Sequence, residues 1–416
     1  VASTGTLDLQ GVTIGAEAVT LNGGTMRVSS GSISLSGSIS LGANSTIDSS
    51  GTSLSLAGVV SGAGGLSKTG AGSLTLSNAN TFSGTTTINA GTLALTNSLA
   101  LQNSTLVVPS PSSRIDFSGL GSATLGGLSG SNDLSLASSF TLTVGNSDIT
   151  SSYSGVLSGT NVSLIKTGTG TLTMSGSNSY TGTTTISGGT LSVSTLSNGG
   201  SNSGIGASPN VAANLVLDGG TLQYNGGAVS TDRLLTLTNN GGTIDASGSG
   251  ALNFTNTGSL AFTGTSTRTL SFTGTSALTN NLSPTIGDNT GATSLVKNGT
   301  GTWALTGSNT YTGATTVSAG ILQIGNGATA GSISTSSAVS ISEAGTLAYN
   351  RSDGASPINS FSGGGTLSNL KTGSTLNLSG ANLSLFSGTY SVAVDESTPT
   401  PTVAQIIFRN TPSLGG

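Results

Sequence analysis

The stretch GAGGLSKTGAGSLTLSNANTFSGTTTINAGTLAL, from Gly62 to Leu95, decides the fold because the chain repeats it. A second copy, SLIKTGTGTLTMSGSNSYTGTTTISGGTLSV, covers residues 163–193, and a third, SLVKNGTGTWALTGSNTYTGATTVSAGILQI, covers residues 294–324. A decayed fourth copy covers residues 370–392. The copies are unequally spaced, which excludes a strict tandem array and indicates a solenoid whose other turns are more degenerate.

The copies keep the same residue types at the same positions. Aligned on Lys68, Lys166 and Lys297, they share two glycines after the lysine, then an asparagine, an aromatic residue and a closing glycine. These residues are Gly70, Gly72, Asn80, Phe82 and Gly91 in the first copy, Gly168, Gly170, Asn178, Tyr180 and Gly189 in the second, and Gly299, Gly301, Asn309, Tyr311 and Gly320 in the third. We expect each lysine to be a solvated charge at a turn, because lysine is rarely buried without a partner.

Apolar and small polar residues alternate within each copy, as in SLTL at Ser73–Leu76, and glycine or asparagine separates the alternating runs. This pattern predicts β-strands joined by turns, either as the hairpins of a sandwich or as the turns of a parallel β-helix. We favour the β-helix, because the pattern continues through the whole chain and the aliphatic residues are small and evenly spread. The prediction is therefore an all-β chain with little or no helix: a single right-handed parallel β-helix of roughly twenty coils over residues 1–394.

The composition narrows the possible functions. Only 6% of the 416 residues are charged, 66 are glycine, and cysteine and histidine are absent. Disulfides and thiolate metal sites are therefore excluded, and the commonest acid–base group is missing. The net charge of −4 with no basic run argues against nucleic acid as a partner, and no apolar stretch is long enough to predict a membrane span. Because the chain begins at Val1, we expect a processed or excised chain whose targeting segment lies upstream.

The repeated pattern Lys-x-Gly-x-Gly-x-Leu-x-Leu, followed by Asn-x-(Phe/Tyr)-x-Gly-x-Thr-Thr, resembles the autotransporter-associated β-strand repeat, also called the passenger-associated repeat. This repeat occurs in the passenger domains of surface and secreted proteins of Gram-negative bacteria. The resemblance implies a right-handed parallel β-helix that is exported and displayed at the cell surface. It implies no catalytic residues, so none is transferred to this sequence.

Acidic residues are candidates for polysaccharide cleavage, which needs two neighbouring carboxylates. Two sets have spacings near one coil and could meet on adjacent coils: Asp116, Asp133 and Asp148, and Asp218, Asp232 and Asp245. The alternative is that they are turn residues whose spacing is accidental, with Arg114 pairing with Asp116. Ser163 with Lys166 and Ser294 with Lys297 imitate the Ser-x-x-Lys motif of penicillin-binding enzymes, but they lie in glycine-rich strands. We therefore expect no enzyme, and we assign no catalytic, cofactor-binding or metal-ligating residue and no cofactor.

The tail, residues 395–416, differs from the rest of the chain. It contains one compact apolar run between Pro401 and Pro412. An end coil leaves backbone groups unpaired, so this run either covers the last coil of its own chain or pairs with a neighbouring copy. The candidate assembly strand consists of Val403, Ala404, Gln405, Ile406, Ile407 and Phe408.

These observations predict a non-enzymatic extracellular structural protein. It would be a stiff β-solenoid rod that acts as a surface passenger or as the subunit of a fibre assembled end to end from identical copies. The first alternative is an adhesin that binds glycans or host surfaces, and the second is a polysaccharide-acting enzyme on a β-helix. In each case we expect the outer surface of a Gram-negative-type bacterium or its surroundings, with no nucleic acid partner.

Overall fold

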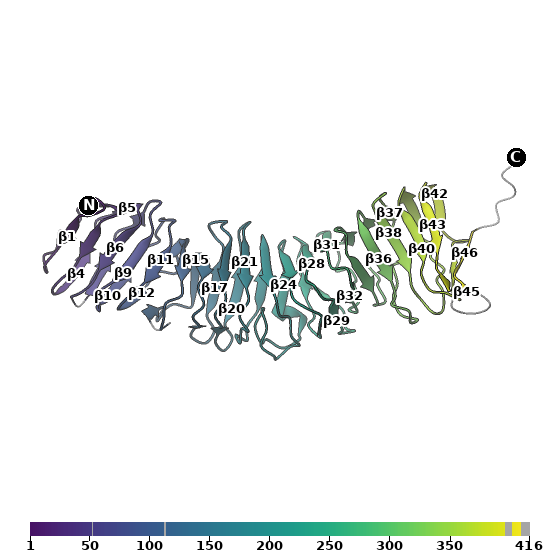
Figure 1. Ribbon diagram of the computed structural model, residues 1–416, viewed down its shortest axis with the longest axis horizontal. Coiled ribbons are helices and arrows are strands. Elements are labelled where there is room, and N and C mark those ends of the chain that lie inside the picture. The colour runs from purple at the N-terminus through teal and green to yellow at the C-terminus, as the bar shows by residue number, and fades with distance from the viewer. Residues whose placement is uncertain (52, 112–113, 396–401, 409–416) are drawn as a thin grey trace. The chain divides into compact units, whose positions relative to one another are not determined.

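The computed structural model describes residues 1–51, 53–111, 114–395 and 402–408. The chain forms two compact units: Val1–Val193 with Gly200–Pro209, and Ser194–Gly199 with Asn210 onward. In each unit the strands lie side by side in long parallel ladders, one strand per turn of the chain (Figure 1). The described residues contain no α-helix and one short 3-10 helix, η2 (Ala212–Asn214). The predicted all-β parallel β-solenoid is confirmed.

Unit 1 consists of three faces that the chain visits in order on every turn. Its longest ladder is β1 (Thr6–Asp8), β3 (Thr25–Arg27), β6 (Ser45–Asp48), β9 (Leu66–Thr69), β11 (Thr86–Ile88), β13 (Leu101–Val107), β15 (Ser122–Ser129), β17 (Thr141–Val144), β20 (Ser163–Lys166) and β22 (Thr184–Ile186). The second face is β4 (Ser32–Leu35), β7 (Ser53–Leu56), β10 (Ser73–Leu76), β12 (Thr92–Leu95) and β14 (Ile115–Asp116), and later β18 (Ser151–Tyr153), β21 (Thr171–Met174) and β23 (Thr190–Val193). The third is short: β2 (Val19–Asn22), β5 (Ile39–Ala43) and β8 (Val60–Ser61), then β16 (Leu134–Ser135) and β19 (Leu157–Ser158).

Unit 2 repeats this plan with longer second and third faces. The first ladder is β24 (Leu215–Leu217), β27 (Thr236–Leu237) and β30 (Ala261–Phe262). The second is β25 (Thr221–Tyr224), β28 (Gly242–Ala246), β31 (Arg268–Thr273), β33 (Thr293–Lys297), β35 (Thr315–Val317), β37 (Val339–Ile341), β39 (Ser360–Gly363) and β42 (Asn382–Phe386). The third is β26 (Val229–Thr231), β29 (Leu252–Phe254), β32 (Thr279–Leu282), β34 (Thr302–Leu305), β36 (Gly320–Ile324), β38 (Gly345–Tyr349), β40 (Thr366–Asn369) and β43 (Thr389–Val392).

Two further pairs lie at the C-terminal end of unit 2. They are β41 (Thr375–Asn377) with β46 (Gln405–Ile407), which is parallel, and β44 (Val394–Asp395) with β45 (Thr402–Val403), which is antiparallel. With one strand of the long ladder per turn, the described part of unit 1 has ten turns and that of unit 2 has eight, slightly fewer than the roughly twenty predicted. That residues 1–394 form one continuous column, with a separate tail at 395–416, stays a prediction.

The core of each unit consists of like residues stacked in register. On β7, β10 and β12 the residues Leu54, Leu74 and Leu93 lie directly above one another and are fully buried. Burial of one such side chain contributes about 1.5–3 kcal/mol, and it is repeated at every turn. The alternate residues face outward, where Ser53, Ser73 and Thr92 form a half-buried hydroxyl row. The alternation seen in the sequence is therefore the alternation of inside and outside.

Candidate functional site

The three repeat lysines lie inside the solenoid, in the rows of aliphatic and aromatic core residues. Lys68 stacks in register between Ile47 and Ile88, and it is fully buried. The other two repeat this placement, Lys166 between Val144 and Ile186, and Lys297 between Phe272 and Val317. The prediction of a solvated charge at a turn is wrong. A sequence signal was available, because strand alternation puts Lys68 on the same face as Leu66.

Each buried ammonium is compensated by three backbone carbonyls at a corner. The Lys68 Nζ donates to the carbonyl oxygens of Thr69 at 2.6 Å, Gly70 at 2.8 Å and, one turn further along, Ala90 at 3.1 Å. Lys166 donates to the equivalent oxygens of Thr167, Gly168 and Gly188 at 2.6, 3.2 and 3.2 Å. Lys297 donates to those of Asn298, Gly299 and Ala319 at 2.6, 2.9 and 3.1 Å. The lysine therefore ties two successive turns together at their corner.

The repeat glycines make room for this arrangement. Gly91, in the turn above Lys68, has a φ of 64°, and an added Cβ would lie 2.2 Å from the Gly72 oxygen and 2.8 Å from the Lys68 Nζ. Gly320 repeats the geometry beside Lys297, with a φ of 63° and only 2.4 Å between an added Cβ and the Gly299 oxygen. Only glycine combines this backbone conformation with so close an approach.

Burial lowers the pKa of Lys68, Lys166 and Lys297 to about 8, and the Asp48 and Asp148 carboxylates partly oppose this shift for the first two. A lowered lysine pKa inside a protein can indicate a nucleophile. Here the ammonium is fully buried and its protons point at fixed carbonyls, so it has no access to a substrate. The arrangement stabilises a corner and offers no reactive group.

The repeat asparagines and aromatic residues complete the interior. The Asn309 amide accepts a bond from Ile286 N at 2.8 Å and donates to the Ser332 oxygen at 2.7 Å, so it joins the turns on either side of its own. Asn80 and Asn178 form the same kind of bridge. The buried Tyr311 hydroxyl lies 2.7 Å from that of Thr315. These positions are structural, like the lysines.

The decayed fourth copy does not reproduce the lysine site. Lys371 lies in a turn and is half-buried, and its carbonyl accepts from the Ser374 hydroxyl. Val392, which aligns with Ile88, is 42% exposed. The lysine corner is therefore specific to the three well-kept copies within the described residues.

The candidate aspartates accept hydrogen bonds from backbone and side-chain donors, most of them on other turns and some only two residues along the chain. Asp133 accepts from Val156 N, Asp148 from Thr169 N, and Asp116 from Ser118 N. In unit 2, Asp218 accepts from Thr238 and Asn240, Asp232 from Gly199 and Asn210, and Asp245 from Gln223 and Ser247. The expected partner of Asp116 is placed differently, since the Arg114 guanidinium donates to the Asn89 carbonyl at 2.7 Å.

Within the described residues no group of three acidic side chains could hold a metal ion, and no helix is long and apolar enough to cross a membrane.

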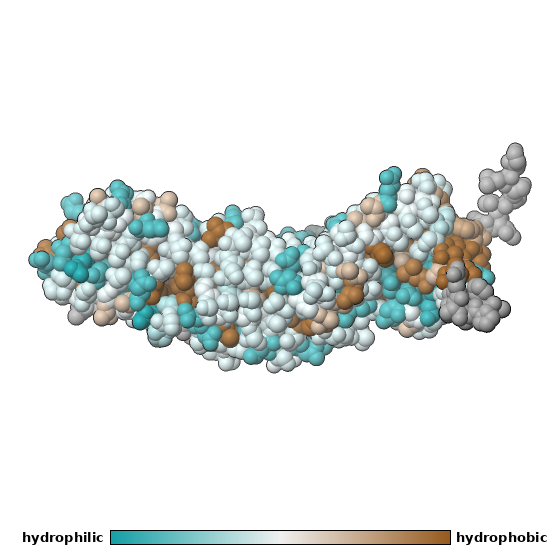
Figure 2. Space-filling model, viewed as in Figure 1, coloured by the Kyte–Doolittle hydropathy of each residue, from teal (hydrophilic) through white to brown (hydrophobic). Residues whose placement is uncertain are grey.

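The candidate assembly strand lies along its own chain. β46 pairs with β41 in register, and Leu376 is opposite Ile406. Ala404 is buried, whereas Val403, Ile407 and Phe408 are 43–45% exposed. Phe408 contacts Tyr390 edge-on, with ring centroids 4.8 Å apart. Figure 2 shows apolar residues gathered on these last turns of unit 2. Pro401 and Pro412, which flank the run, lie outside the described residues.

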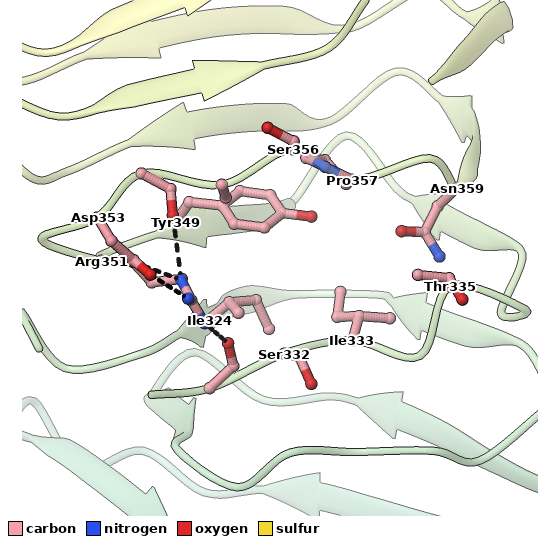
Figure 3. Close-up of a pocket in the computed structure, with 13 residues that line it drawn as sticks. Ile324, Ser332, Ile333, Thr335, Tyr349, Arg351, Asp353, Ser356, Pro357 and Asn359 are labelled. Carbon is pink, nitrogen blue, oxygen red and sulfur yellow. Dashed lines mark hydrogen bonds and ion pairs between the residues drawn. The ribbon is translucent and has the colours of Figure 1, made fainter. Parts of the chain in front are cut away.

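A groove of about 340 Å³ opens in unit 2 between two loops, residues 325–338 and 350–359 (Figure 3). Arg351 holds the loops together: its Nη2 pairs with the Asp353 carboxylate at 2.7 Å, its Nε donates to the Gly354 carbonyl at 3.1 Å, and its Nη1 donates to the Gly331 carbonyl. The inner wall contains Tyr349, which is 4% exposed and whose hydroxyl has no hydrogen-bond partner. This groove could not be predicted from the sequence, because no repeat covers these loops.

The comparisons with known proteins agree with the repeat pattern. The model of the passenger-associated-transport-repeat matches residues 66–95, 164–193 and 295–324. A segment of 132 residues is 37% identical to the adhesin BmaC autotransporter of Brucella suis biovar 1 (strain 1330). This segment covers 31% of the chain but only 4% of the adhesin, so the chain spans a small part of that relative. No solved structure matches the chain.

Proposed function

We propose that this chain, which carries three passenger-associated-transport repeats, is a non-enzymatic structural segment of a protein exported to the surface or surroundings of a Gram-negative-type bacterium. The observation that supports the proposal most is the lysine corner. The residues that the three copies share are engaged in holding turns together, which is what a scaffold needs and what a catalytic site does not.

The energetics favour a stiff scaffold in each unit. Successive turns are joined by parallel backbone hydrogen bonds and by stacked core residues, and in the three repeat copies also by buried polar bridges at the corners. Bending such a stack would break bonds on one side, as in cross-β structures. Charges are rare, at 6% of residues, so like charges seldom stack on one another.

Adhesion is the second candidate function, and the named activity of the matched relative favours it. As an adhesive segment, the chain would contact a glycan or host surface itself. As a scaffold, it would hold other segments of the protein away from the cell. Cells that display the full protein separate the two. A scaffold predicts that deleting residues 163–324 weakens adhesion and that the purified chain does not compete with the cells. A binding segment predicts that the purified chain competes. Unchanged adhesion and no competition would contradict both.

For the apolar run Val403–Phe408, we propose that it caps the last turns of its own chain. The pairing of β46 with β41 supports this over strand addition to a neighbour, because one edge of β46 is already occupied. The exposed side chains on its other face leave end-to-end assembly of identical copies as the alternative. Light scattering of the purified chain tests them, since capping predicts a monomer and strand addition predicts chains of copies that disappear when Val403–Phe408 is deleted.

A further inference from the structure

We propose that the groove between residues 325–338 and 350–359 binds one neutral sugar unit of a glycan. The biological role of this site rests on the proposed adhesive function. The binding itself is inferred separately, from an unsatisfied buried hydroxyl, a neutralised charge pair and a cavity of suitable size.

The Tyr349 hydroxyl is the main observation. Tyr349 is 4% exposed, and its oxygen has no hydrogen-bond partner in the described structure. In Figure 3 it lies between Pro357 and Ile333 at the inner wall of the groove, and the oxygen itself is covered from solvent. A buried hydroxyl without a partner is unfavourable, so a ligand hydroxyl that displaces the groups over it and bonds to it restores a lost hydrogen bond. By contrast, the buried Tyr311 and Tyr153 hydroxyls have partners, Thr315 and the Asn132 carbonyl.

The charges of the groove favour an uncharged ligand. The Arg351 guanidinium is engaged with Asp353 at 2.7 Å and with two backbone carbonyls, so its positive charge is balanced within the protein. An anion would have to compete with Asp353, and a cation with Arg351. A neutral molecule with hydroxyl groups avoids both penalties.

The walls favour an amphipathic ring. Ile324, Ile333 and Pro357 provide apolar surface, while the exposed Thr335 and Ser356 provide hydroxyls at the rim. A sugar ring has an apolar face of C–H groups and a polar edge of hydroxyls, and it fits this division. The volume, about 340 Å³, lies at the small end of the range for ligand sites and suits one or two sugar rings.

The test is saturation-transfer NMR on the purified full chain, with neutral hexoses, N-acetylhexosamines and their disaccharides as probes. We expect at least one probe to bind in the millimolar range. Y349F should weaken binding about fivefold, the effect of one hydrogen bond, without lowering stability, because the hydroxyl has no partner to lose. I333W should abolish binding by filling the groove. The matched control Y153F, which removes a buried hydroxyl in unit 1, should lower stability and leave binding unchanged.

Binding that survives both Y349F and I333W, or no binding by any probe, would overturn the inference. If I333W proves unfolded, Y349F alone decides. A failure here is distinguishable from a failure of the proposed function. Cells that adhere through this chain while the groove binds no sugar refute only the groove. A sugar in the groove with no effect of Y349F on cell adhesion refutes only the adhesive role.

Discussion

Replacing Lys297 with methionine tests the lysine corner most sharply. Methionine keeps an unbranched apolar chain between Phe272 and Val317, so the packing of the row is preserved. What disappears is the ammonium, which donates to the carbonyls of Asn298, Gly299 and Ala319 at 2.6–3.1 Å. Burial alone lowers the pKa of Lys297, whereas a carboxylate also acts on Lys68 and Lys166. K297M therefore tests the carbonyl contacts without a change in an acidic neighbour.

The magnitude follows from two opposing effects. Each buried carbonyl left without a donor costs about 1–3 kcal/mol, so three carbonyls set an upper bound of about 9 kcal/mol. Removing a buried charge returns several kcal/mol of desolvation, which offsets much of this loss. We expect K297M to lower the free energy of unfolding by about 3 kcal/mol. For a unit of this size that corresponds to a fall in Tm of about 6–12 °C.

Trp303 provides the assay, because it is the sole tryptophan and lies buried in the same unit. Its fluorescence during urea or thermal unfolding compares K297M with the wild-type chain. The matched control is K371M, since Lys371 is half-buried in a turn, and it should change stability by no more than about 0.5 kcal/mol. If K297M is as stable as the wild type or more so, the buried ammonium is a net burden and does not stabilise the corner.

Gly320→Ala should destabilise unit 2 by about 2 kcal/mol or more, because of its positive φ and its approach to carbonyl oxygens, whereas Gly227→Ala, with no atom near its added Cβ, should be close to neutral in the same unfolding assay. The pKa of the buried lysines is about 8 in the folded chain, below the unfolded value, so the unfolded chain binds more protons between pH 8 and 10 and the free energy of unfolding should rise with pH in that range. Above pH 10 the free energy of unfolding should fall, because burial raises the pKa of Tyr311 to about 12 and the folded chain then binds more protons. Urea titrations at each pH check both signs. Deleting Val403–Phe408 should expose the last turns to protease while the earlier turns stay intact, and a digestion pattern identical to the wild type would rule out the cap.

Much of the fold could be predicted from the sequence, because each turn of a solenoid repeats the same pattern of strands, turns and buried positions. The alternation in SLTL at Ser73–Leu76 specified both the strand and its buried face, and the in-register stacking of Leu54, Leu74 and Leu93 follows from repetition. The resemblance to the passenger-associated repeat is confirmed by the three matched segments.

The interior position of Lys68 was not predicted, because the general preference of lysine for the surface was given more weight than the alternation of buried and exposed residues along the strand. Lysine is rarely buried, yet Leu66 and Lys68 lie two residues apart on one strand and must share a face. The compensation comes from backbone carbonyls at a corner, and carbonyls have no sequence signature. The neighbouring glycines were the only visible trace of it.

The groove could not be predicted for a different reason. Tyr349 and Ile324 are register partners on the adjacent strands β38 and β36, but the groove beside them depends on the path of two irregular loops, 325–338 and 350–359. Such loops lack the periodicity that specifies the strands. The aspartates were limited in another way. Their spacing near one coil suggested that they could meet on adjacent coils, but spacing cannot predict the backbone and side-chain donors that bind each carboxylate.

The parallel, in-register stacking of adjacent turns can be tested with paired cysteines, since the chain has none of its own. Ser55 and Thr75 are register partners on adjacent strands, so the Cα atoms of S55C and T75C should lie within reach of a disulfide. The pair S53C and T75C is displaced by two residues and should not form one. Oxidation of the first pair and not the second, read as a mobility shift on a non-reducing gel, is the predicted result. Oxidation of the second pair in preference to the first would contradict the parallel, in-register stack.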